Sequence, residues 1–197
     1  SFSSTDIDGL GTGKAKNSVD SYTVSVYADK ATDTGYVEGS ITYGINENSA
    51  SRLVNVSGLS RDFTSSYDST QLSVNVAAGT PNEVSEGTFI TPFASFTGTL
   101  IDTDAYTEKS SVANDNLRLT VDPEDVSSMV GSLGLKAHKV TSKGTPMISL
   151  ALKNEFGDNQ INSSNSYAGG GTKFKTSTEV EELSAVLGLG YSFGNDM

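Results

Sequence analysis

Residues 183–193 read Leu183-Ser184-Ala185-Val186-Leu187-Gly188-Leu189-Gly190-Tyr191-Ser192-Phe193. Alternate positions from Leu183 to Phe193 carry apolar side chains, and they are opposed by Glu182, Ser184, Gly188 and Gly190. A hydrophobic period of two places successive side chains on opposite faces of an extended chain. The stretch therefore predicts a β-strand with one apolar face and one small, polar face.

The same alternation recurs along most of the chain. The apolar positions are Tyr22, Val24, Val26 and Ala28; Val37, Gly39, Ile41, Tyr43 and Ile45; Leu72, Val74, Val76 and Ala78; Leu133, Leu135 and Ala137; and Ile148, Leu150 and Leu152. Between Phe89 and Ile101 the pattern is weaker, because Phe93 and Phe96 fall on opposite faces. There we assign Ile90, Pro92, Ala94, Phe96 and Leu100 to the apolar side. The chain also has 51 Ser and Thr and 20 Gly residues, which are poor helix formers, so the prediction is an all-β protein.

The links between these stretches alternate in length. Residues 30–34, 80–86 and 141–145 are short links, whereas 5–18, 55–64, 103–125 and 157–179 are longer, polar and rich in Gly, Asn and Ser. Alternating short and long links indicate a sheet with tight turns at one end and excursions at the other. We therefore expect about eight up-and-down antiparallel strands, of which residues 2–5 are the first.

Composition excludes many functions. The 197 residues include 13 Lys and Arg against 24 Asp and Glu, a net charge of −11 that disfavours binding to nucleic acid. There is no cysteine and a single histidine, His138, for which no Ser or carboxylate partner is identifiable. We expect no catalytic residue, no metal ligand and no cofactor site, and therefore no enzyme.

An alternating sheet can face either water or lipid, and three features favour lipid. The polar face is small, with Glu38, Lys136, Lys153 and Glu182 as its occasional charges. No charge lies on the apolar face of the clean strands, as expected where a basic residue at the bilayer midplane costs about 2–4 kcal/mol. Aromatic residues lie near strand ends, where a membrane barrel has its girdles: Tyr22, Tyr43, Tyr191 and Phe193.

The polar face of such a barrel would line its lumen. The expected lumen-facing residues are Ser25, Glu38, Thr42, Ser73, Ser132, Lys136, His138, Ser149, Lys153, Glu182, Ser184 and Gly188. The alternative is a soluble β-sandwich that binds carbohydrate or forms a surface layer, with Tyr27, Tyr36 and Phe93 as candidate sugar platforms.

The order of five motifs resembles the C-terminal translocator domain of autotransporters, the type V secretion proteins. The motifs span residues 20–28, 35–44, 91–96 (with 105–108 after it), 130–135 and 187–193. The residues that carry the resemblance are Tyr27, Gly44, Pro92, Phe93, Tyr106, Glu108, Gly131, Gly134, Gly190, Tyr191 and Phe193.

The resemblance implies a twelve-stranded transmembrane β-barrel in the bacterial outer membrane that exports an N-terminal passenger domain through its lumen. The implied partners are outer-membrane lipid, a passenger domain outside this chain and the outer-membrane assembly machinery. Two features depart from the family: Lys109 follows Glu108 where glycine is usual, and residues 194–197 do not form a terminal aromatic strand. We therefore expect one domain over residues 1–197 that lacks the first and last strands of the barrel. The alternative within the membrane class is a small outer-membrane porin or adhesin barrel.

Overall fold

The computed structural model describes residues 1–8 and 15–193. The polar end at residues 194–197, which departs from the family pattern, lies outside the described residues.

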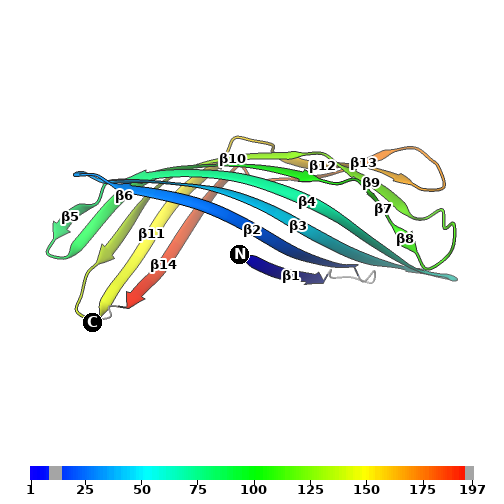
Figure 1. Cartoon of the computed structure of the whole chain (residues 1–197), viewed down its shortest axis with the longest axis horizontal. Helices are drawn as coiled ribbons and strands as arrows, with labels where there is room; N and C mark the ends of the chain where they lie inside the picture. The colour runs from blue at the N-terminus through cyan, green and yellow to red at the C-terminus, as the bar shows by residue number, and fades with distance from the viewer. Residues whose placement is uncertain (9–14, 194–197) are drawn as a thin grey trace.

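One long antiparallel sheet dominates the structure (Figure 1). Its strands follow chain order: β1 (Phe2–Asp8), β2 (Ala15–Ala31), β3 (Tyr36–Val56), β4 (Leu59–Gly79), β6 (Thr88–Thr103), β10 (Val126–Lys139), β11 (Gly144–Glu155) and β14 (Leu183–Phe193). A short strand, β5 (Asn82–Ser85), pairs with β6. The predicted up-and-down order is confirmed, and each alternating stretch lies in one strand of this path.

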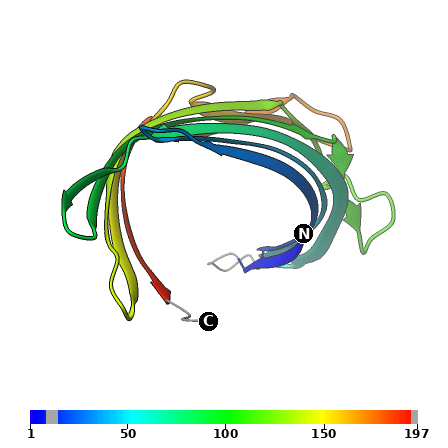
Figure 2. The same cartoon turned by 60° about the vertical axis from the view of Figure 1, so that its left-hand side comes forward.

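The sheet curls into an open arc (Figure 2). Strands β1 and β14 form its two edges, and within the described residues they do not pair with each other. No second layer packs against the sheet in this part of the chain, and its buried apolar side chains are only Phe63, Ala77 and Ala151. A β-sandwich buries its apolar faces between two sheets, so the β-sandwich alternative is wrong.

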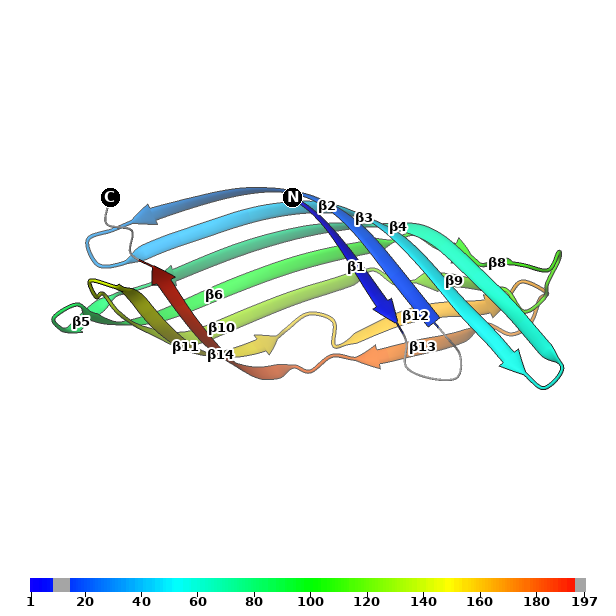
Figure 3. The ribbon, with the colours of Figure 1, turned by 90° about the horizontal axis from the view of Figure 1, so that it is seen from below.

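A second sheet continues four of these strands beyond their long-link end (Figure 3). Its order is β13 (Phe174–Glu179), β12 (Gln160–Tyr167), β9 (Leu119–Pro123) and β7 (Tyr106–Thr107). In the chain, β7 follows β6, β9 precedes β10, β12 follows β11 and β13 precedes β14. The links predicted over 103–125 and 157–179 therefore contain these four strands.

The link predicted over 55–64 is a tight turn instead. Strands β3 and β4 pair continuously from Tyr36↔Gly79 to Val56↔Leu59, and Gly58 has a φ of 78°, which glycine adopts readily. Each strand has 21 residues, about twice the length of roughly 9–11 that crosses a bilayer. The prediction was wrong because the outer halves of these strands are rich in Ser, Asn and Asp, and their convex face, which is apolar elsewhere in the sheet, is polar.

The two faces of the sheet differ in exposure. Directly paired residues share a face, so the register follows each face from strand to strand. The buried side chains of the main path all lie on the polar face: Asn48, Phe63, Ser69, Ala77, Thr91, Ser132 and Ala151. Because side chains converge on the inside of a curved sheet, the polar face is concave. The apolar face is convex, and its side chains are exposed, as for Val24 at 72 % and Leu189 at 79 %.

Candidate functional site

The concave face carries a ladder of hydroxyl groups on its N-terminal arm. Ser25 pairs with Thr42, which pairs with Ser73. The Ser25 and Thr42 hydroxyls are 2.8 Å apart, and the Ser73 hydroxyl is 3.0 Å from that of Thr99 on β6. These hydrogen bonds join hydroxyl groups of neighbouring strands, and the side chains that carry them are small.

The remaining residues of the predicted polar face lie mainly on the C-terminal arm. Two rows cross it: Ser132↔Lys153↔Ser184 and Lys136↔Ser149↔Gly188. His138 shares this arm, and its imidazole stacks on Phe89 with ring centroids 5.0 Å apart. Glu38 lies on the opposite arm, beside Asp29 of β2. Glu182 lies in the bend before β14, where Asn159 Nδ2 donates to its carboxylate at 3.4 Å.

The motif residues divide between the two faces. Tyr27, Gly44, Phe93, Gly134 and Gly190 lie on the concave face, and Pro92, Gly131, Tyr191 and Phe193 lie on the convex face. The ring of Phe93 covers Gly134, its direct partner across the β6–β10 pair. A bare glycine in a strand exposes its backbone, and an aromatic ring laid over it restores the packing.

Glu108 reaches the concave face through an irregularity at the end of β6. With the register of β4 and β6, Phe63 would pair with Lys109, but it pairs with Ser110 of β8 (Lys109–Ser110). One extra residue therefore lies between Thr103 and Lys109. Such an insertion reverses which face each side chain occupies, and it places Glu108 and Ser110 on the face of Phe63.

Glu108 is the centre of a buried ionic cluster there. Arg52 Nε and Nη2 donate to its two carboxylate oxygens at 2.6 and 2.7 Å, and the Leu119 N–H donates at 2.7 Å. The Arg52 guanidinium also lies 4.1 Å from the centroid of the Phe63 ring. This bidentate pair fixes the segment after β6 to the β3–β4 hairpin.

An aromatic pair adjoins the cluster. Tyr67 and Tyr106 stack in near-parallel planes with centroids 4.2 Å apart. Burial, with smaller contributions from Tyr67 and Glu108, raises the pKa of Tyr106 to about 12. The hydrogen bond to Glu108 raises the pKa of Arg52. Sequence reasoning named Tyr106 and Glu108 but missed Arg52, Phe63 and Tyr67, because these three lie outside the apolar alternation.

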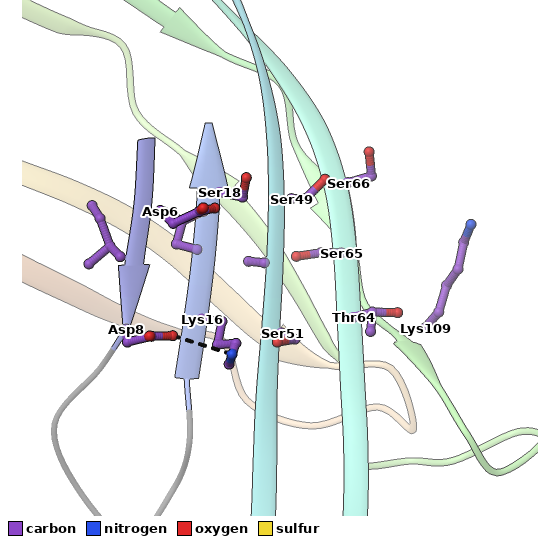
Figure 4. A pocket seen from close by; sticks show the side chains of 13 residues that line it. Asp6, Asp8, Lys16, Ser18, Ser49, Ser51, Thr64, Ser65, Ser66 and Lys109 are labelled. Carbon is purple, nitrogen blue, oxygen red and sulfur yellow. Dashed lines mark ion pairs between the residues drawn. The ribbon is translucent and has the colours of Figure 1, made fainter. Parts of the chain in front are cut away.

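A hollow of about 570 Å³ lies among the outer ends of β1 to β4 (Figure 4). Its wall includes hydroxyl groups and one exposed ion pair, in which Lys16 Nζ is 3.6 Å from Asp8 Oδ1. Among the described residues, none of these hydroxyl groups is hydrogen-bonded to the side chain of Asp6, Asp8 or Lys16, so the hollow shows no activated nucleophile. Over residues 1–8 and 15–193, no three side chains of the His, Asp or Glu type are placed to hold a metal ion.

The convex face is apolar in its middle and aromatic at both ends. We call its exposed middle side chains the apolar band: Val24, Val26, Ile41, Val74, Phe96, Leu133, Leu150, Leu187 and Leu189. Phe2 and Tyr22 meet at the long-link end with centroids 5.3 Å apart, and Tyr191 and Phe193 meet at the short-turn end at 4.8 Å. None of the described residues belongs to a helix long and apolar enough to cross a bilayer.

Comparison with known proteins identifies what this sheet resembles. The family model described as the autotransporter beta-domain matches residues 1–196. Among solved structures, the chain is similar to the translocator domain of the autotransporter NalP from Neisseria meningitidis, with a TM-score of 0.60 and 17 % sequence identity. That match covers 93 % of this chain and 68 % of the NalP chain. A search of curated proteins finds no match.

Proposed function

This chain belongs to the autotransporter β-domain family, and on that premise we propose that it forms the wall of the lumen through which an N-terminal passenger domain reaches the cell surface. Domains of this family are translocators of the bacterial outer membrane. The observation that carries the proposal is the inverted sheet: the exposed convex face is apolar, and the concave face is small and polar. A lipid-embedded barrel needs this arrangement, because lipid surrounds it and water fills it.

The free edges of the arc support a larger barrel. In hydrocarbon every backbone N–H and C=O must be paired, so an open sheet edge is not tolerated there. We propose that further strands pair with β1 and β14 and close a barrel of about twelve strands, as the family resemblance implies. The eight strands of the main path would then be a part of its wall, which disfavours a complete small porin.

The partners follow from the two faces. We propose that the apolar band contacts outer-membrane lipid, that the aromatic pairs lie at its two interfaces, and that outer-membrane assembly machinery inserts the domain. The concave face offers hydroxyl and glycine surface to a passing chain, and we assign no bond-making or bond-breaking chemistry to it.

Partition between buffer and detergent tests this proposal. The chain is expected to require detergent, and its mobility in a gel should change on boiling, because a folded membrane barrel resists the denaturing detergent until heated. A monomer that stays folded in plain buffer would contradict the translocator function.

A further inference from the structure

The charges of the concave face are separated by sign. Behind the apolar band, its acidic side chains are Asp29 of β2 and Glu38 of β3, which are direct partners. Its ammonium groups are Lys136 of β10 and Lys153 of β11. Strands β4 and β6, which lie between these pairs, present no charged side chain to this face from Ser69 to Gly79 or from Thr88 to Thr103.

Two further carboxylates lie at the long-link end of the C-terminal arm. Glu155 of β11 accepts hydrogen bonds from Ser128 Oγ and from the Met129 and Gly157 N–H groups, and Glu182 accepts one from Asn159 Nδ2. The separation by sign therefore holds from the row Glu38↔Ala77↔Ser95↔Ser132↔Lys153 to the short-turn end of the sheet. Arg52 lies beyond the apolar band and is paired with Glu108. His138 lies beside Lys136 on the same face of β10, where its ring stacks on Phe89.

The four separated charges are available to interact with a molecule bound at the concave face. Asp29, Glu38 and Lys153 are exposed and Lys136 is half-buried. Among the ion pairs of the described residues, none includes any of the four. Strands β10 and β11 lie toward one edge of the curved sheet and β2 and β3 toward the other, with β4 and β6 between them (Figure 2), so the two signs occupy two separate walls of the arc.

We propose that these walls impose a transverse electric field on a polypeptide in the lumen, turning its basic side chains toward β2–β3 and its acidic side chains toward β10–β11. The inference rests on the proposed function, since it assumes that a chain passes along this face. A low-dielectric wall focuses the field of its charges into the space that it encloses. The lumen would therefore bind a polypeptide segment in the orientation that its charged side chains favour.

The absence of cysteine from the chain makes a clean test possible. Three single variants, Ser40→Cys, Ser149→Cys and Ser73→Cys, replace half-buried serines of the concave face. Ser40 is two residues from Glu38, Ser149 pairs with Lys136, and Ser73 lies on the uncharged β4 as the matched control. Each folded variant is reacted with two short Gly-Ser peptides whose activated cysteine disulfide is flanked either by two lysines or by two glutamates.

The ratio of the two reaction rates reports the local potential, because the reactivity of the thiol itself cancels. At low salt the lysine peptide should react about tenfold faster than the glutamate peptide at Ser40→Cys, with the reverse order at Ser149→Cys and a ratio near one at Ser73→Cys. High salt should bring all three ratios together. Adding Lys136→Gln and Lys153→Gln to Ser149→Cys, or Asp29→Asn and Glu38→Gln to Ser40→Cys, should abolish the preference.

Equal ratios at the three positions would overturn the inference. If the heat-dependent mobility shift persisted in those samples, the proposed function would stand while the field did not. If the shift were absent, the barrel itself would be refuted, and the oriented lumen with it.

Discussion

At the scale of single residues, Gly134 is a position where no side chain fits. A Cβ there would lie 2.6 Å from the Leu150 carbonyl oxygen and 2.6 Å from Cζ of Phe93. The β10–β11 ladder holds that carbonyl, so Gly134→Ala should destabilise the fold by about 1–3 kcal/mol and lower the urea midpoint in detergent. Gly98→Ala is the control, because its nearest atom would be 3.8 Å away. Equal midpoints for the two variants would refute this account.

Glu108 should hold the segment after β6 in place. Glu108→Gln removes the negative charge to which Arg52 donates two hydrogen bonds. The free energy of unfolding should fall by about 1–3 kcal/mol. We expect trypsin to cleave after Lys109 and Arg118 faster in this variant than in the parent. Glu124→Gln breaks the exposed pair with Lys175 and should leave the cleavage rate unchanged. Resistance of Glu108→Gln to trypsin would argue against a structural role for the pair.

The pKa of Tyr106 predicts a loss of order at high pH. Its folded value is about 12 against an ordinary 10.0, so the folded state holds the phenol proton more tightly than the unfolded state. The stabilisation is complete below pH 10 and disappears as the pH rises through the folded pKa. Burial also raises the pKa of Tyr67, so the tyrosinate absorbance should show a late step that Tyr106→Phe diminishes by the amplitude of one tyrosine. An undiminished late step in Tyr106→Phe would disprove the assignment.

At the scale of elements, the convex face of β10 distinguishes lipid from water. Leu133 is 70 % exposed in the middle of the apolar band. Leu133→Arg should cost about 2–4 kcal/mol in a bilayer and reduce the fraction of chains that insert into liposomes. Ser49→Arg adds the same charge to the convex side of the projecting β3–β4 hairpin and should insert normally. If both variants inserted equally well, the face would not meet lipid.

The elements that the sequence predicts are those with one apolar face. The period of two located β2, β3, β4, β6, β10, β11 and β14, because burial in lipid leaves a strict alternation. It did not reveal that β3 and β4 continue beyond the apolar band, where the convex face is polar and the pattern disappears. Nor did it reveal the extra residue before β8, because an insertion that turns Glu108 toward Arg52 has no signal in composition.

At the scale of the whole molecule, three of the acidic residues that contribute to the net charge of −11 form one row on the convex face. Past the long-link end of the apolar band, Asp20, Glu47 and Asp68 are direct partners in one row across the convex face. Like charges directly opposite repel, and a row of them is tolerable only in water. We therefore expect the membrane to end before this row. Its side chains come from three strands, so the sequence alone does not display it.

The separation of the two edge strands, β1 and β14, can be tested with disulfides. If the eight strands of the main path do not close by themselves, cysteines on β1 and β14 lie too far apart for a disulfide, which requires Cα atoms within about 7 Å. Thr5→Cys is combined in turn with Ser184→Cys, Gly188→Cys and Ser192→Cys, all on the concave face, to cover different registers. None should oxidise within the chain, whereas Ser25→Cys with Thr42→Cys, direct partners, should do so readily. A disulfide in any β1–β14 pair would mean that β1 and β14 close on each other, and no further strands would be needed to complete the wall.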